Sequence, residues 1–484
     1  MFSWHSVLYA SSFVDRSGGS PLTWCFRIES RPVVLSAASS ALKRQLGLTA
    51  VMALVMGNML GSGIFFTPGT LAAVADANWQ VYFIWALCGL IVLCGALTLG
   101  ELASLLPRAG ASYHIIREGF GPGWGFVKAW MESWVSAPGS IASIAIVFGE
   151  LLSGFLGRGS PQLLGIGAVA LFAAINLRGV EWGGRTQIAL TAIKIAGLLA
   201  LVFGSYFLVE RVPPAVAAEA GGGGLFAFLR FVGLGVAAVL FTYDGWTDVS
   251  HLAGEVSEPH RTLPRGLGLG VLGITLLYLV MNDAFLRVVP LAQMREEGAT
   301  VGTKLAIATF GDVGGQVVSG LILISIFGAL GGLVMTIPRL VYAASAEYAA
   351  MTSGRSGHRF LAALARVSPR TQVPAAAILF CAVLATIAIL FFGTFERLVA
   401  FIVVPLQLTN ILMVASVFRL RKRALSSPDQ YLTPGYPFVP LAFILAMGLL
   451  LVNAIVFNPR DTLIGVALTA LAVPVYLWIR KGVA

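Results

Sequence analysis

Two short polar stretches interrupt apolar segments that are long enough to cross a lipid bilayer. One is Gly61-Ser62-Gly63, and the other is the run FTYDGWTD at residues 241–248. A break in a helix frees backbone N–H groups at the start of one half and C=O groups at the end of the other. The N–H end attracts a carboxylate, and the C=O end attracts an ammonium group. Two breaks that face each other therefore predict a receptor for a molecule that carries both charges, such as an amino acid.

The glycines expected at the breaks are Gly61, Gly63 and Gly245, and the first two have two interpretations. A glycine has no Cβ to block the approach of a substrate to the backbone. Small residues also allow close packing between membrane helices, which is a purely structural role. Pro68 follows the first break, and the second break lies in the sixth apolar segment, where a five-helix repeat would place its counterpart. Because paired breaks are typical of inverted-repeat transporters with a site at the midplane, they favour the binding interpretation.

Ionisable residues inside apolar segments are candidates for function, because a charge is costly within a membrane. Glu101 and Glu150 lie near predicted segment ends, where solvation or a structural ion pair is expected, and Asp283 lies within a segment. For Glu132, a structural and a functional role are equally open. Asp244 either binds a substrate or a proton, or it caps the second half of its broken segment, since Asp is a good N-cap residue.

Lys194 is the one basic residue that the sequence places near the middle of an apolar segment. An unpaired ammonium group there would cost several kcal/mol. We therefore expect its side chain to face the bundle and to contact carbonyl groups freed near the first break. A cation fixed at this position would hold the first segment against the fifth and would repel a sodium ion. The alternative is a lysine that extends to the membrane surface and only anchors a helix end.

No group of residues predicts catalysis or cofactor binding. The five histidines are isolated in the sequence, and the four cysteines lack the spacing of zinc ligands or of a redox pair. The glycine run at 221–224 is not followed by the Lys-Ser/Thr of a phosphate-binding loop. We therefore predict no metal, no cofactor and no enzymatic activity.

The elements that must position these residues are membrane-spanning helices. Of the 484 residues, 57% are apolar and 11% are charged, whereas a soluble domain carries about 25% charged residues. A run of about 18 apolar residues is enough to cross a bilayer core of roughly 30 Å. The predicted spans are 45–73, 80–106, 124–154, 162–178, 186–209, 226–253, 264–289, 313–346, 373–393, 396–419, 438–457 and 461–480. We expect an all-α polytopic membrane protein with 12 transmembrane helices.

The basic residues indicate how these spans are oriented. Most of the 32 Lys and Arg residues fall in the tail and in the loops that share its side, with a cluster at 419–423. Because cytoplasmic loops are enriched in Lys and Arg, we expect a multi-pass protein of the cell (inner) membrane with both termini in the cytoplasm. The net charge of +10 then reflects orientation, and no nucleic-acid binding is expected. Residues 1–40 are predicted to be a disordered cytoplasmic tail, and the sequence leaves open whether they include the true N-terminus.

Several motifs resemble those of the amino acid–polyamine–organocation (APC) superfamily, in particular its L-amino-acid transporter branch. They are GNMLGSGIF at 57–65, ELASLLPRAG at 101–110 with Tyr113 and EGFG at 118–121, FTYDGW at 241–246 with EVSEPHRTLPR at 255–265, and RLVYA at 339–343. The resemblance implies a LeuT-type fold within a transporter domain at 41–484. Its 5+5 inverted repeat would consist of 45–209 and 226–419, followed by two extra helices in 438–480.

The resemblance also implies roles for individual residues. The positions that match substrate-binding positions of the family are Met59, Ser62, Gly63, Ile64, Phe241, Thr242 and Asp244. Among these, Ser62 and Gly63 match the carboxylate-binding positions, and the carbonyls of Met59, Phe241, Thr242 and Asp244 match those that bind the amino group. The Phe241 side chain matches an aromatic gate, and Lys194 matches a fifth-helix lysine of sodium-independent members. Asp244 stands where the family usually has glycine, so side-chain specificity is expected to differ.

These features predict a secondary active transporter that moves amino acids by alternating access, through sodium-independent exchange or proton-coupled symport. Lys194 is the predicted coupling residue. An amino acid sensor, or transceptor, on the same fold is the alternative. The expected partners are the amino acid, protons in the symport case, and the lipid bilayer. Because no outer-loop cysteine is suited to an intersubunit disulfide, no obligate heavy-chain partner is expected. The sequence leaves the carried amino acid and the oligomeric state open.

Overall fold

The computed structural model describes residues 42–212, 224–297, 301–352, 357–392, 403–423, 430–457, 466–467 and 469–480. The chain divides into two units, Met1–Ala37 and Ala38–Ala484. All of the described residues belong to the second unit. The predicted tail at 1–40 therefore lies outside them.

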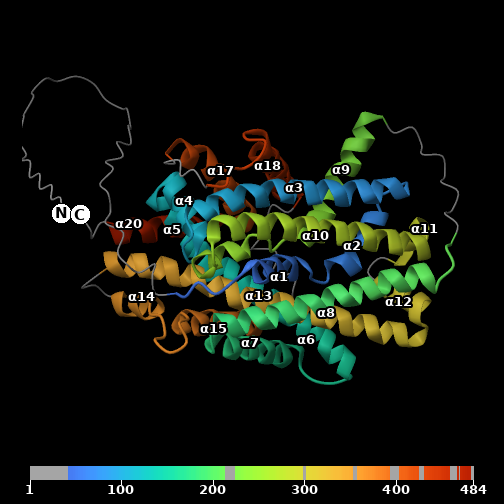
Figure 1. Cartoon of the computed structure of the whole chain (residues 1–484), viewed down its shortest axis with the longest axis horizontal. Coiled ribbons are helices and arrows are strands. Elements are labelled where there is room, and N and C mark those ends of the chain that lie inside the picture. The colour runs from blue at the N-terminus through green and yellow to red at the C-terminus, as the bar shows by residue number, and fades with distance from the viewer. Residues whose placement is uncertain are drawn as a thin grey trace, which may run out of the picture. The chain divides into compact units, whose positions relative to one another are not determined.

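The described part of the chain is α-helical, and its only β-type pairing is an isolated bridge between Leu46 and Val256. Long helices run side by side in the second unit (Figure 1). The helices are α1 (Leu48–Met59), α2 (Gly63–Ala72), α3 (Asn78–Leu105), α4 (Ala111–Phe120), α5 (Pro122–Met131), η2 (Glu132–Ser136), α6 (Ala137–Leu156), α7 (Pro161–Leu177), α8 (Val180–Phe207), α9 (Leu225–Leu240), η3 (Phe241–Tyr243), η4 (Asp248–Glu255), α10 (Pro259–Val288), α11 (Leu291–Glu297), α12 (Val301–Phe310), α13 (Asp312–Met351), α14 (His358–Leu364), α15 (Ala375–Phe392), α17 (Val403–Arg423), α18 (Phe438–Phe457) and α20 (Ala472–Arg480).

Among the described residues, 7 helical stretches are long and apolar enough to cross a membrane. They are α3, Pro122–Leu156, α8, Leu225–Glu255, α10, α13 and α15. The pair α1 and α2 passes the same test together, with a bend of 45° between the two helices, and makes an eighth span if it is counted as one. The helices α7, α17, α18 and α20 overlap four further predicted spans, 162–178, 396–419, 438–457 and 461–480. The prediction of an all-α polytopic membrane protein is therefore confirmed.

The structure differs from the predicted spans in several details. The third predicted span, 124–154, contains the π-helix η2, and the second half of the sixth is the 3-10 helix η4. The short helices α4, α11, α12 and α14 were not predicted, because hydropathy detects spans and these helices are too short to be spans. Parts of the tenth and twelfth predicted spans, at 396–402 and 461–465, lie outside the described residues.

Helix α1 packs against α8, α10 and α13 and lies in the middle of the bundle (Figure 1). Glycines on the neighbouring helices make this packing possible. A Cβ at Gly270 of α10 would lie 2.7 Å from Val55 Cγ1, and a Cβ at Gly332 of α13 would overlap the Asn58 side chain. Close approach through small residues is typical of helix packing in membranes. It places the end of α1, and hence the first break, deep in the bundle.

The segment before α1 pairs with the segment after η4. The backbone N–H groups of Gln45 and Leu46 donate to the Glu255 carbonyl at 2.8 and 2.9 Å, and the Ser257 N–H donates to the Leu46 carbonyl at 2.9 Å. The Glu255 carboxylate in turn accepts a hydrogen bond from Arg339 Nε of α13 at 2.8 Å, and both side chains are fully buried. We call these five residues the N-terminal latch, because they tie the start of α1 to η4 and α13.

Candidate functional site at two helix breaks

The first predicted break is present in the structure. Helix α1 ends at Met59, and α2 begins at Gly63. The N–H groups of Leu60 and Gly61 still donate backward, to the Met56 and Met59 carbonyls at 2.8 and 2.9 Å. On the other side of the break, the first N–H groups of α2 have no acceptor within their own helix. The break therefore presents the positive end of α2 beside the last carbonyls of α1.

The second predicted break is present as well. Helix α9 ends at Leu240, the 3-10 turn η3 continues to Tyr243, and Asp244 is extended, with φ −71° and ψ 162°. Gly245 has a φ of +100°, which side chains other than glycine rarely tolerate. A Cβ at Gly245 would also lie 3.0 Å from the backbone carbonyl carbon of Asn58, near the end of α1. Both the backbone conformation and the contact between the two breaks thus require glycine here.

Side chains join the two breaks directly. Asn58 Nδ2 donates to Asp248 Oδ2 at 2.9 Å, and the hydroxyl oxygens of Thr67 and Thr242 lie 2.9 Å apart. A Cβ at Gly63 would lie 2.7 Å from the Thr242 side chain. The packing role that the sequence left open for the glycines therefore applies to Gly63. The two breaks face each other, as the sequence predicted.

Tyr278 of α10 bridges the breaks from a third side, and the sequence analysis did not single it out. Its hydroxyl donates to the Met59 carbonyl at 2.8 Å and also lies 3.2 Å from the Thr242 carbonyl. Both carbonyls were expected to be free for a substrate amino group. Each carbonyl oxygen keeps a second lone pair. Tyr278 therefore fixes the position of the two carbonyls and leaves each of them able to accept another hydrogen bond. The sequence signal that could have identified Tyr278 is its hydroxyl group, which stands alone in the apolar run at 276–280.

Lys194 of α8 lies against the end of α1. Its Nζ donates to the Gly57 carbonyl at 2.7 Å and to the Leu60 carbonyl at 2.9 Å, and its side chain is fully buried. One turn earlier on α8, Thr191 Oγ1 donates to the Ala53 carbonyl at 2.9 Å. The predicted contact with carbonyls near the first break is therefore confirmed. The alternative of a lysine that extends to the membrane surface is wrong.

The first break borders open space. A Cβ at Gly61 would meet no atom within 4 Å, and Ser62 is half-buried. Phe241, the predicted gate, is 53% exposed, so its aromatic ring is accessible at the second break. Ile64 is fully buried, so its side chain belongs to the core. The geometry thus leaves room for a small molecule beside Gly61 and Ser62.

A group of charged side chains lies beside the second break. Glu132, the first residue of η2, pairs with Lys128 at 2.7 Å, and both side chains are buried. Lys128 Nζ also lies 3.5 Å from Thr409 Oγ1. Both charges interact electrostatically with Asp244 and Asp248. Because π-helices occur often at functional sites, the position of Glu132 in η2 favours the functional role that the sequence left open.

Asp244 does not cap the second half of its span. Helix η4 begins at Asp248 with Thr247 in the N-cap position, and no side chain makes a cap hydrogen bond there. The Asp244 carboxylate instead lies beside the backbone N–H of Gly245. Asp244 therefore lies at the break itself, beside the carbonyls of η3.

Two other candidate carboxylates have structural partners. Glu101 accepts two hydrogen bonds from Arg421, at 2.7 and 2.8 Å, which confirms the structural ion pair expected for it. Asp283 accepts hydrogen bonds from the hydroxyls of Tyr82 and Tyr206. Within the described part of the chain, no three His, Cys, Asp or Glu residues gather closely enough to hold a metal ion.

Comparison with known proteins agrees with this architecture. The sequence pattern of the family described as amino acid permease matches residues 46–478. The serine/threonine exchanger SteT of Bacillus subtilis (strain 168) is 29% identical over 445 residues, which cover 91% of this chain and 98% of that protein. The b(0,+)-type amino acid transporter 1 of Homo sapiens is 27% identical over 73% of this chain and 71% of its own length. The cystine/glutamate transporter of Homo sapiens is 26% identical over 91% and 87%, respectively. Since the family pattern covers most of the chain, the protein belongs to the amino acid permease family of the APC superfamily.

Proposed function

We propose that this protein is a secondary active transporter that moves amino acids across the inner membrane by alternating access. In this proposal, 12 helices form a LeuT-type bundle with inverted repeats at 45–209 and 226–419, and both termini lie in the cytoplasm. The observation that carries the proposal is the contact between the two helix breaks, which joins Asn58 to Asp248 and Thr67 to Thr242. The relatives, which are named as transporters or exchangers of amino acids, support the substrate class.

A zwitterionic amino acid fits the two breaks in one orientation. Its carboxylate would lie at the positive end of α2, where Gly61 leaves open space and Ser62 offers a hydroxyl group. Its ammonium group would face the carbonyls at the end of η3, beside the Asp244 carboxylate. The exposed ring of Phe241 would then close over the bound molecule. In each contact, a charge of the substrate meets the opposite partial charge of a helix end.

Lys194 supports a cycle that does not use sodium. Its ammonium group already occupies the space between the Gly57 and Leu60 carbonyls, where a small cation would otherwise find ligands. Two cations so close together would repel each other in a medium of low dielectric constant. Exchange and proton-coupled symport both fit this arrangement. The two mechanisms differ in whether uptake requires an amino acid on the other side of the membrane.

Counterflow in proteoliposomes tests the proposal. The purified full-length chain, reconstituted without any other protein, should take up a labelled amino acid when the vesicles are loaded with the unlabelled one. Testing a panel of amino acids identifies the substrate, and empty vesicles with an imposed pH gradient separate symport from exchange. Binding of an amino acid without any counterflow would favour a sensor instead. Activity only after addition of a second protein would contradict an independently acting transporter.

Gly61→Leu should reduce uptake at least about tenfold without loss of folded protein. The new side chain would extend into the open space beside the first break, because no atom lies within 4 Å of a Cβ at this position. Gly167→Leu, in the shorter apolar helix α7, is the matched control, since a Cβ there also meets nothing within 4 Å. Uptake and thermal stability are measured for both variants. Equal uptake by the two variants would show that the substrate does not bind at the first break.

Asp244→Asn should change the preference between cationic and neutral amino acids, or the pH dependence of uptake. A hydrogen bond to a charged group contributes about 1.5–3 kcal/mol, so the preference should change about tenfold or more. Asp248→Asn is the control, because that carboxylate is already bound to Asn58 and should affect mainly stability. The measurement is competition of uptake by a cationic and a neutral amino acid across a pH series. An Asp244→Asn protein with only a lower melting temperature would leave Asp244 a structural role.

A further inference from the structure

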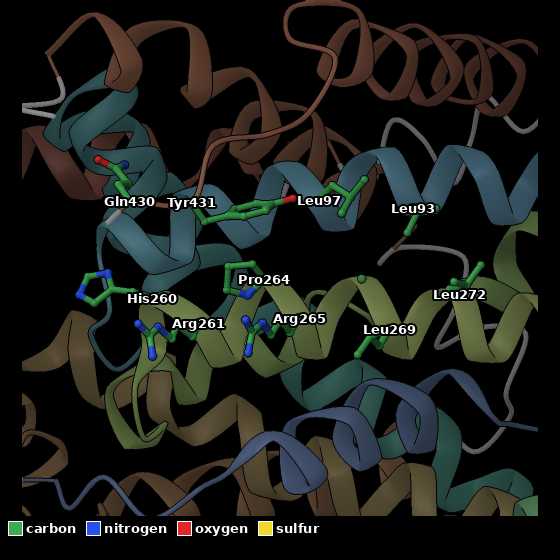
Figure 2. Close-up of a pocket in the computed structure, with 11 residues that line it drawn as sticks. Leu93, Leu97, His260, Arg261, Pro264, Arg265, Leu269, Leu272, Gln430 and Tyr431 are labelled. Carbon is green, nitrogen blue, oxygen red and sulfur yellow. The ribbon is translucent and has the colours of Figure 1, made fainter. Parts of the chain in front are cut away.

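A groove of about 610 Å³ lies between α3, α10 and the segment that precedes α18. Figure 2 shows the residues that line it along the two helices. Leucines line most of its length, among them Leu93 and Leu97 of α3 and Leu269 and Leu272 of α10. An apolar groove along two helices that span a membrane faces lipid chains, unless another helix covers it.

One end of the groove is basic. His260, Arg261 and Arg265, near the start of α10, gather toward the left in Figure 2, and the leucines extend to the right. Arg261 and Arg265 are four residues apart on one helix, so they lie on the same side of it. Within the described residues, neither guanidinium group has an ion pair or a hydrogen bond to another side chain. Two cations without an ion-pair partner among the described residues thus border one end of the apolar groove.

The wall opposite α10 is held in place. The segment before α18 contributes Gln430 and Tyr431 to the lining. Two residues on, the Thr433 backbone N–H donates to the Glu101 carboxylate at 2.6 Å, and Arg421 holds the same carboxylate. The Gln430 side-chain Nε2 is buried and has no hydrogen-bond partner in the part of the chain that the structure describes. The wall therefore offers a hydrogen-bond donor that a ligand could satisfy.

The floor of the groove is formed where α3 and α10 approach closely. A Cβ at Gly100 of α3 would lie 2.9 Å from Pro264 Cα, so only glycine permits this approach. Gly268 of α10 lines the groove, and a Cβ there would lie 3.4 Å from Leu97 Cδ2. The contact at Gly100 therefore closes the space between the two helices beneath the groove, and the small residue Gly268 leaves the groove above it open.

We propose that this groove binds an anionic phospholipid, with its phosphate at Arg261 and Arg265 and one acyl chain along the leucines. Leu272 follows Arg261 by 11 residues, which is about 16 Å along a helix. That length matches roughly half of a 30 Å bilayer core, so the groove spans one leaflet from the headgroup level to the midplane. Basic pockets at the cytoplasmic ends of membrane helices bind anionic headgroups. A free phosphate ion would leave the leucine-lined length without an occupant.

The test compares lipids with identical acyl chains and different headgroups. Purified full-length protein in detergent should retain phosphatidylglycerol in native mass spectrometry more strongly than phosphatidylcholine. In an Arg261→Gln/Arg265→Gln variant, phosphatidylglycerol affinity should fall roughly 25-fold, since each basic residue contributes about fivefold. The control variant, Arg178→Gln/Arg370→Gln, loses the same charge outside the groove and should bind as the wild type does.

A second variant addresses the apolar part of the groove and guards against misfolding of the first. Gly268→Leu keeps both arginines and fills the channel, so it should weaken retention of both lipids. Equal retention of the two lipids by the wild type, or unchanged retention by both groove variants, would overturn the proposal. Stabilisation by inorganic phosphate alone, to the same extent as by phosphatidylglycerol, would assign the arginines to a soluble anion and would overturn it as well.

Discussion

Replacing Lys194 by alanine should reduce transport at least about tenfold at every pH, and the wild type should transport equally well with and without sodium. The Lys194 ammonium group satisfies the Gly57 and Leu60 carbonyls at 2.7 and 2.9 Å. Its removal leaves two buried acceptors unpaired, at a cost of about 1–3 kcal/mol each. It also releases α8 from the end of α1, beside the proposed substrate site. Uptake into proteoliposomes in sodium-free buffer, across a pH series, measures both expectations.

A second pair of variants separates the position of the ammonium group from its charge. A Cβ at Gly328 of α13 would lie 2.6 Å from Lys194 Cε, so Gly328→Ala should displace the lysine without removing it. Gly320→Ala, on the same helix, is the control, because nothing lies within 4 Å of a Cβ there. We expect Gly328→Ala to impair transport and Gly320→Ala to leave it unchanged. A strict sodium requirement of the wild type, or wild-type rates of Lys194→Ala at every pH, would contradict the coupling role of Lys194.

Arg339→Met should lower the free energy of unfolding by about 3–5 kcal/mol, which is the usual cost of removing one partner from a buried ion pair. Arg339 Nε donates to Glu255 at 2.8 Å, its Nη1 donates to the Met335 carbonyl at 2.6 Å, and both charged side chains are fully buried. The variant leaves the Glu255 charge without its partner in the interior. Unfolding of the detergent-solubilised protein, followed by intrinsic fluorescence, gives the difference.

Two controls decide whether the buried charge is the cause. Arg339→Met/Glu255→Gln removes both charges and should recover a large part of the lost stability, since uncompensated charge is the main cost. Arg185→Met breaks the exposed pair with Glu181 and should cost at most about 1 kcal/mol, because exposed ion pairs contribute little. A double variant as unstable as Arg339→Met alone would show that packing, not charge, accounts for the loss.

The sequence was most informative where a local signal contradicted its surroundings. Glycines inside an apolar segment predicted the break at Gly61 and Gly63, and the polar run predicted the break at Gly245. The cost of burying an ammonium group predicted that Lys194 contacts carbonyls near the first break, and it does. In each case, the local physical chemistry admits few solutions within a membrane.

The sequence was less informative where the outcome depends on distant partners. The hydrogen bonds from Asn58 to Asp248 and from Tyr278 to Met59 join residues 190 and 219 positions apart. The sequence around Asn58 and Tyr278 does not indicate which distant residue is the partner, so only the assembled bundle gives these side chains a role. The ion pair between Lys128 and Glu132 has the i,i+4 spacing of a helix. Its burial, however, follows from packing that hydropathy does not report.

The N-terminal latch would limit any conformational change in which the start of α1 leaves η4. Its backbone part consists of the bonds from Gln45 and Leu46 to Glu255 and from Ser257 to Leu46. A net contribution of about 0.5–1.5 kcal/mol for each of three bonds corresponds to an opened fraction between about one molecule in ten and one in a thousand. A ligand that binds the opened form about a hundred times more tightly would make that form the majority wherever the closed form outnumbers it by less than about a hundred to one. The backbone of this short segment thus holds an equilibrium that binding energies of ordinary size can shift in either direction.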